Sequence, residues 1–259
     1  MEQAGYAYLS DSVKILRVVE NETHGTFELE GLYRGYGVTI GNALRRVMLS
    51  SLPGAAITRF KIKGVGHEFT AVSGVIEDVV EIGLNLKAVR FTFNAKEPQV
   101  LTLKVKGEKE VKAGDIKGNA DVIVKNPDQH IATLTGKNAE LDMELTIEKG
   151  LGYVPVLAQK TGKLPVGTMA LDAIFSPVRN VSFSVSNMRV GERIDYNKIT
   201  LNIETDGTLS PSRALHKASK ILLDHFKIIS DLDVKDAEEA APLTAEEGKK
   251  AKKTRKALE

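Results

Sequence analysis

Residues 35–54 read Gly-Tyr-Gly-Val-Thr-Ile-Gly-Asn-Ala-Leu-Arg-Arg-Val-Met-Leu-Ser-Ser-Leu-Pro-Gly. Small and apolar residues recur there at spacings of three and four, the pattern of one amphipathic helix. The apolar face comprises Ile40, Ala43, Leu44, Val47, Met48 and Ser51. Thr39 is the predicted N-cap, because its hydroxyl can accept a bond from a first-turn N–H. Pro53 and Gly54 are predicted to end the helix, which should pack on a sheet or another helix.

The opposite face of this helix carries Asn42, Arg45, Arg46 and Leu49. Arginine beside an apolar residue is typical of a protein contact, since the guanidinium offers several planar donors. Single exposed apolar residues are also common on solvated helices, so both interpretations stay open.

Three glycines at the start of the stretch suggest a second interpretation. Gly35, Gly37 and Gly41 nearly form a dinucleotide-binding loop, but the third glycine is one residue late. No acidic residue ends a following strand about twenty residues on, as that motif requires. We therefore expect these glycines to allow a tight turn and close packing of the helix.

Composition restricts the classes of function. The chain has 259 residues, no cysteine and a formal net charge of +2, and its five histidines lack metal-ligand spacing. We therefore expect no thiolate chemistry, no metal and no cofactor. Aromatic residues make up 5 % of the chain and Trp is absent, which argues against base stacking. Without a signal-peptide pattern at the first residues or an apolar run of about 18–20 residues, a cytoplasmic location is expected.

Strand patterns occupy most of the remaining chain. Residues 13–19 and 25–30 are predicted to form a hairpin before the helix. Residues 54–172 alternate apolar and polar side chains between turn signals, most clearly over 141–147, as half-buried strands do. Further strands are expected at 178–185 and 199–204. The Gly- and Pro-rich residues 150–167 are predicted to form a long loop.

Two more helices are predicted. A short one should begin at Ser73 or Gly74, with Glu77 and Asp78 as first-turn acids rather than a catalytic pair. A long one should begin at Ser210-Pro211, with an apolar stripe broader than one contact face requires. That stripe comprises Ala214, Leu215, Ala218, Ile221, Leu222, Phe226, Ile228 and Ile229. Residues 236–259 lack apolar periodicity and are predicted to be disordered. The basic cluster at 248–256 is interpreted as part of a solvated tail, and weak contact with nucleic acid is the alternative.

Four blocks resemble one known family. Residues 37–54 resemble the first helix of the N-terminal domain of the bacterial RNA polymerase α subunit. The other blocks are His67-Glu68-Phe69 with residues 74–79 and 84–87, then 189–198, then 205–211. Their order and spacing span residues 11–232.

The resemblance implies an α+β fold of two domains. A discontinuous domain of a sheet and two long helices, residues 1–53 plus 173–234, would form a homodimer. Residues 54–172 would be an inserted β-rich domain, and 235–259 a tail. The dimer would be a non-catalytic scaffold for the polymerase subunits β and β′, which hold the nucleotidyltransferase activity, with ω and sigma joining in the holoenzyme. Family members often carry a further DNA-binding domain, and we expect this chain to contact DNA only indirectly.

The same resemblance implies which residues make each contact. The β-binding residues would be Asn42, Arg45, Arg46, Leu49, Ser50, His67, Glu68 and Phe69. The β′-binding residues would be Val80, Asn85, Lys87, Arg179, Arg189, Arg193 and Asp195. The dimer interface would use Leu44, Met48, Leu215, Leu222 and Phe226. One residue departs from the family pattern, because Tyr33 stands where an acid is expected before Arg34.

Two alternatives remain open at this point. An enzyme could place its active site at the Gly-rich segments near Gly35 and Gly150, although no nucleophile–base pair or metal set supports one. A homodimer that binds some other partner would share every feature except the family motifs.

Overall fold

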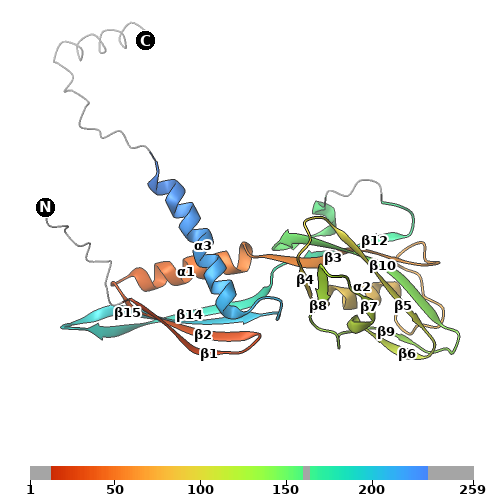
Figure 1. Cartoon of the computed structure of the whole chain (residues 1–259), viewed down its shortest axis with the longest axis horizontal. Coiled ribbons are helices and arrows are strands. Elements are labelled where there is room, and N and C mark those ends of the chain that lie inside the picture. The colour runs from red at the N-terminus through yellow and green to blue at the C-terminus, as the bar shows by residue number, and fades with distance from the viewer. Residues whose placement is uncertain (1–12, 160–163, 233–259) are drawn as a thin grey trace, which may run out of the picture. The chain divides into compact units, whose positions relative to one another are not determined.

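The computed structural model describes residues 13–159 and 164–232 (Figure 1). The helices are α1 (Tyr36–Ser50), α2 (Val79–Lys87) and α3 (Pro211–Ser230), with 3-10 turns η1 (Ala113–Asp115) and η2 (Val156–Ala158). The strands are β1 (Lys14–Glu20), β2 (His24–Leu32), β3 (Pro53–Ile62), β4 (Phe91–Phe93), β5 (Gln99–Lys106), β6 (Lys109–Lys112), β7 (Ile116–Lys117), β8 (Val122–Val124), β9 (His130–Leu134), β10 (Glu140–Leu151), β11 (Tyr153–Val154), β12 (Thr168–Ala170), β13 (Ala173–Ile174), β14 (Val178–Val190) and β15 (Arg193–Thr205). The predicted α+β class is confirmed. The chain divides into two compact units between Leu222 and Leu223, within α3.

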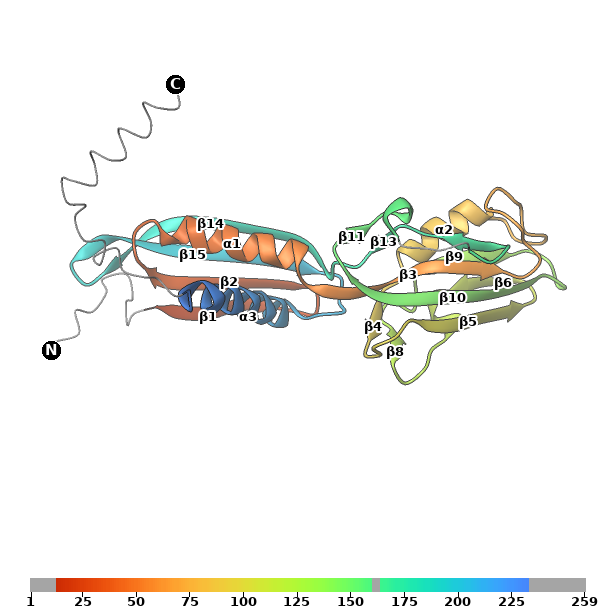
Figure 2. The ribbon, with the colours of Figure 1, turned by 90° about the horizontal axis from the view of Figure 1, so that it is seen from above.

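One hydrophobic core lies between an antiparallel sheet of order β1-β2-β15-β14 and the helices on its face. Figure 2 shows α1 lying along β14 and β15, as predicted for its apolar face. The first half of α3 contributes to the same core. Its most buried members include Phe27, Leu44, Met48, Ile199, Leu201, Ala214 and Ala218.

The glycines of the opening stretch permit this packing. Gly35 has a φ of 87°, which favours glycine, and precedes the first helical residue. A Cβ on Gly37 would lie 2.7 Å from Val185 Cγ1, and one on Gly41 would lie 2.6 Å from Phe183 Cδ2. The predicted role of these glycines in a turn and in close packing is therefore confirmed.

The start of α1 differs from the prediction. The helix begins at Tyr36, so Thr39 lies inside its first turn and is not the N-cap. Asn197 of β15 supplies the missing acceptor, because its Oδ1 accepts from the N–H of Gly35 at 2.8 Å and of Gly37 at 3.3 Å. Its Nδ2 donates to Asn187 Oδ1 at 3.3 Å, and the residue is buried. A buried strand amide thus caps the helix that decides the fold.

A second, separate core lies against a sheet of order β12-β3-β10-β5-β7. In β10, the alternating residues Leu141, Met143, Leu145 and Ile147 are all buried, as the period of two predicted. Helix α2 packs against β3 and β9 on this core. Shorter ladders, β4-β8, β6-β9 and β11-β13, complete this part of the chain.

Helix α2 begins at Val79, later than the predicted start at Ser73 or Gly74. Asp78 is its N-cap and accepts from the Glu81 N–H at 2.7 Å, while Glu81 reaches back to the Asp78 N–H. This capping box fixes the start of the helix. Glu77 therefore lies outside the helix, and its predicted first-turn role is wrong.

Glu77 instead ties the α2 start to β9. Its carboxylate accepts from the Thr133 N–H at 2.6 Å and the Thr133 hydroxyl at 3.0 Å, and it lies 2.9 Å from His130 Nε2. Burial alone would raise the pKa of Glu77, but these hydrogen bonds outweigh it and hold the pKa below its usual value.

Replacing Glu77 with glutamine should lower the free energy of unfolding at pH 7 by about 1–2 kcal/mol, since charge-assisted bonds are lost. A carboxyl whose pKa is lowered by folding stabilises the protein above its unfolded pKa and loses that contribution as pH falls through its folded pKa. The difference in the free energy of unfolding between wild type and Glu77→Gln should therefore shrink toward zero as the pH is lowered. Urea melts from pH 7 to pH 3 measure it; a gap constant with pH would contradict the role of the charge.

The last hairpin is longer than predicted, because β14 and β15 continue to a turn at Gly191. Helix α3 begins at Pro211, as predicted, and the Ser212 N–H donates to Glu20 Oε1 at 2.9 Å. A carboxylate of β1 thus provides an acceptor at the start of α3. The predicted tail, residues 236–259, lies outside the described residues.

Candidate protein-interaction surfaces

The predicted β-binding face of α1 lies mostly in solvent. Arg45, Arg46, Leu49 and Ser50 are exposed, and Asn42 is half-buried. Asn42 Oδ1 accepts from Arg45 Nη2 at 3.2 Å, which positions that guanidinium along the helix. Leu49 is 38 % exposed between these polar groups. The face combines an apolar centre with arginine donors, the composition of a contact surface.

An open groove of about 600 Å³ runs between α1 and Leu222 of α3. Asn42 and Arg46 line it together with the apolar Val38 and Val47. Two of the predicted β-binding residues therefore border the predicted dimer residue Leu222. Arg45, Leu49 and Ser50 do not line this groove.

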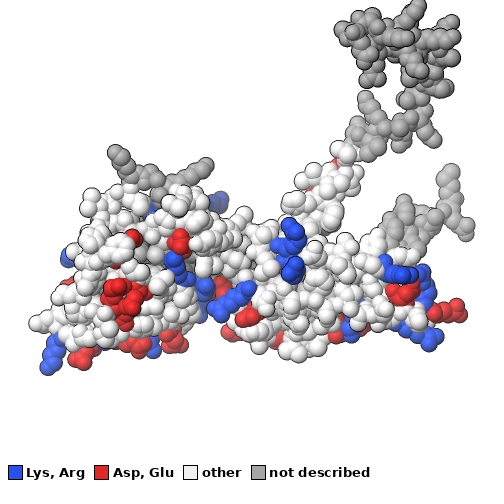
Figure 3. Space-filling model, turned by 180° about the vertical axis from the view of Figure 1, so that it is seen from behind, with Lys and Arg blue, Asp and Glu red and all other residues white. Residues whose placement is uncertain are grey.

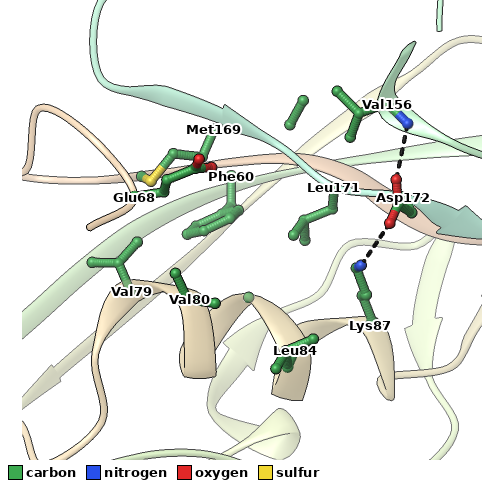
Figure 4. Close-up of a pocket in the computed structure, with 12 residues that line it drawn as sticks. Phe60, Glu68, Val79, Val80, Leu84, Lys87, Val156, Met169, Leu171 and Asp172 are labelled. Atoms are coloured by element: carbon green, nitrogen blue, oxygen red, sulfur yellow. Dashed lines mark hydrogen bonds and ion pairs between the residues drawn. The ribbon is translucent and has the colours of Figure 1, made fainter. Parts of the chain in front are cut away.

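The five-stranded part of the chain holds a cavity of about 170 Å³ beside α2 (Figure 4). Glu68, predicted to bind β, lines it together with Val80 and Lys87, predicted to bind β′. The structure therefore brings residues of both predicted surfaces to one place. Nearby, the exposed Phe69 has 80 % of its surface in solvent, and His67 Nδ1 lies 3.1 Å from Thr70 Oγ1.

Lys87 and Asn85 also have structural partners. Lys87 Nζ lies 3.0 Å from Asp172 Oδ2, and the Asp172 Oδ1 accepts from the Val156 N–H at 2.9 Å (Figure 4). The Val156 hydrogen bond and then Lys87 hold the pKa of Asp172 below its usual value. Asn85 Nδ2 donates to the Ile131 carbonyl at 3.0 Å and so ties α2 to β9. Val80 has no such role and is 40 % exposed.

Arg193 organises the end of the β14–β15 hairpin. Its Nε and Nη2 donate to the two Asp195 oxygens at 3.1 and 2.9 Å. Its guanidinium lies 5.3 Å from the Tyr33 ring centre and 5.6 Å from that of Tyr196, within cation–π range. The Asp195 hydrogen bond raises the pKa of Arg193, and the Arg193 hydrogen bond lowers that of Asp195. The Tyr33 ring thus contacts the Arg193 guanidinium.

The predicted β′-binding residues do not form one cluster. Arg179 is exposed near the start of β14, whereas Arg189 is near its end and donates from Nε to the Gly191 carbonyl at 2.8 Å. Ten residues of strand separate them by about 33 Å. Val80, Asn85 and Lys87 lie on α2, the helix that packs on the other core through Val79, Ile82 and Leu86.

The predicted dimer residues fall into two classes. Met48 is fully buried, and Leu44 and Leu215 are 4 % and 9 % exposed, within the core of their own chain. Leu222 lines the groove, and Phe226 is 59 % exposed. Of these five predicted residues, Leu222 and Phe226 have accessible side chains, whereas Leu44, Met48 and Leu215 pack inside the chain's own core.

Sequence reasoning missed Asn197 and the Glu77 contacts. A signal for Asn197 exists in the sequence, because it is in phase with the buried Ile199, Leu201 and Ile203 of β15. A polar residue at a buried strand position needs a hydrogen-bond partner. No comparable local pattern marks Glu77, whose partners lie 53 and 56 residues away.

Within 13–159 and 164–232, no cluster of three or more His, Asp or Glu side chains is placed to hold a metal ion. No helix in the described part of the chain is long and apolar enough to cross a membrane.

Comparison with known proteins defines the class. A family model described as "RNA polymerase Rpb3/RpoA insert domain" matches residues 60–176, which places the five-stranded part in that class of domain. The chain is 47 % identical to the DNA-directed RNA polymerase subunit alpha of Symbiobacterium thermophilum over 227 residues, 88 % of this chain and 71 % of that protein. It is 46 % identical to the subunit of the same name of Alkaliphilus metalliredigens over 242 residues, 93 % of this chain and 76 % of that protein.

A third relative, from Chloroherpeton thalassium, is 46 % identical over 91 % of this chain and 72 % of its own length and carries the same name. The chain belongs to the family of DNA-directed RNA polymerase alpha subunits. Its role is therefore in transcription, as a subunit of a polymerase complex.

Proposed function

We propose that this chain is a non-catalytic scaffold on which RNA polymerase assembles. Two copies pair, and the dimer binds the β and β′ subunits, which carry the nucleotidyltransferase site; ω and sigma join the assembled enzyme, and DNA is contacted only indirectly. Residues 1–53 with 173–234 form the dimerisation domain, and 54–172 form the inserted domain. The two largest of the three hydrophobic cores are separate, which supports this division.

Exposed apolar side chains on α3 carry the proposal of a dimer. Leu223, Phe226 and Ile229 are 53 %, 59 % and 65 % exposed, and Leu222 lines the groove beside α1. Apolar residues that recur on one helix stripe cost free energy in water and mark an interaction surface. A second copy covers them with the same stripe, in an interface on the order of 2,000 Å².

The dimer presents two copies of each surface, and this duplication explains how one chain serves two partners. A twofold dimer is symmetric, so β and β′ meet equivalent surfaces on different protomers. The cavity shared by Glu68, Val80 and Lys87 supports overlapping contacts, since it mixes residues of both predicted sets.

Replacing Arg45 with alanine should weaken binding of the β subunit about tenfold or more while leaving the dimer intact. The guanidinium is exposed on α1 and is held by Asn42, so its loss removes donors without disturbing the core. Titration of the purified dimer with β measures the effect. Lys106→Ala, at an exposed position of β5, serves as the control and should bind β normally. Unchanged β binding by Arg45→Ala would show that this face of α1 is assigned wrongly.

A further inference from the structure

A second cavity, of about 230 Å³, lies where the start of β3, strand β4 and the start of α3 meet. Three cationic side chains line it: Lys149 of β10, and Arg213 and Lys217 of α3. None of them belongs to the surfaces proposed for β, β′ or the second copy. Figure 3 shows the Lys, Arg, Asp and Glu side chains on the face of the molecule seen from behind the view of Figure 1.

Within residues 13–159 and 164–232, no carboxylate balances the positive charge of this cavity. Among the described residues, no Asp or Glu lines it, and none of the three cations has a carboxylate within 4.0 Å. The adjacent acids are already paired: Glu148 lies 2.7 Å from Arg59 Nη2, and Asp206 lies 3.4 Å from Arg90 Nε. Like charges around one hollow repel each other and raise the local positive potential, which favours an anion there.

The geometry suits an oxyanion with several acceptor atoms. Arg213 and Lys217 are four residues apart on α3, so they project from one face of the helix near its positive end. Lys149 approaches from a different element, so donors can reach a ligand from more than one side. Thr92 also lines the cavity, and its buried hydroxyl has no hydrogen-bond partner within the described chain.

We propose that this cavity binds a phosphate group, with Lys149, Arg213 and Lys217 as its cationic donors. Guanidinium and ammonium groups form short, charge-assisted bonds with phosphate oxygens. Inorganic phosphate and the phosphates of a nucleotide share this chemistry. Neither the scaffold function nor the family relationship requires such a site.

Calorimetric titration of the purified full chain with inorganic phosphate, and separately with ATP without metal, tests the proposal at constant ionic strength. We expect at least one of these two ligands to bind saturably, with one phosphate group bound per chain. ATP that binds about tenfold tighter than phosphate would identify a nucleotide as the source, and equal affinity would identify the phosphate group alone.

The double variant Arg213→Gln/Lys217→Gln should weaken this binding about tenfold or more, and Lys149→Gln should also weaken it. Lys220→Gln is the matched control, because Lys220 is exposed on the same helix and does not line the cavity. Circular dichroism and thermal melts identical to wild type show that the variants fold. Absence of saturable binding, an equal loss in Lys220→Gln, or glutamate binding as tightly as phosphate would each overturn the proposal.

Discussion

Replacing Phe226 with arginine should convert the protein from a dimer to a monomer. Phe226 follows Leu222 by four residues and precedes Ile229 by three, so the three side chains share one stripe of α3. Phe226 is 59 % exposed in the single chain, where a charge costs little. In the paired state the same charge would be buried without a partner, which costs several kcal/mol. We expect the dimer dissociation constant to rise at least about 100-fold, which corresponds to a loss of about 3 kcal/mol in the free energy of dimerisation.

Size-exclusion chromatography with light scattering measures the change directly. Wild type should have a mass of twice 28.2 kDa and Phe226→Arg a mass of 28.2 kDa at the same low micromolar concentration. Lys220→Glu, an exposed polar position on the same helix, should remain dimeric. A Phe226→Arg protein that stays dimeric would remove α3 from the interface.

Replacing Asn197 with alanine should destabilise the four-stranded part of the chain by about 2–3 kcal/mol. The change removes the acceptor for the Gly35 and Gly37 N–H groups and the donor to Asn187, in a buried setting. Each buried polar group left without a partner costs about 1–3 kcal/mol, and a lost helix cap costs about 1 kcal/mol. The melting temperature should fall by about 5–10 °C.

Thermal melts followed by circular dichroism test the capping role. Asn202→Ala is the matched control, because Asn202 lies on the same strand but is exposed, and its Oδ1 accepts from the Thr26 hydroxyl at the surface. Its melting temperature should change little. Equal stability of Asn197→Ala and wild type would mean that α1 does not depend on this cap.

The elements that sequence predicted well are those set by local pattern. The apolar alternation in β10 identifies its buried side chains, and Pro211 marks the first residue of α3. The helix starts that were predicted wrongly depend on residues distant in the sequence. Thr39 satisfied the local capping rule, but Asn197, about 160 residues away, provides the cap and allows α1 to begin earlier.

The candidate surfaces could be predicted only in part, for a related reason. Periodicity shows that Met48 and Phe226 are both on apolar helix stripes, but it does not say what covers each stripe. Met48 is buried by its own sheet, whereas Phe226 remains exposed. Likewise, Asn85 and Lys87 match the family blocks, yet both side chains bond within the chain. Distinguishing a chain's own core from a partner's contact requires the fold.

Co-expression with β and then β′, followed by size-exclusion chromatography with light scattering, tests the central claim most directly. The account predicts a dimer of this chain alone, a complex of two copies with one β, and a larger assembly when β′ is added. A stable dimer that binds neither β nor β′ would preserve the fold and contradict the scaffold function.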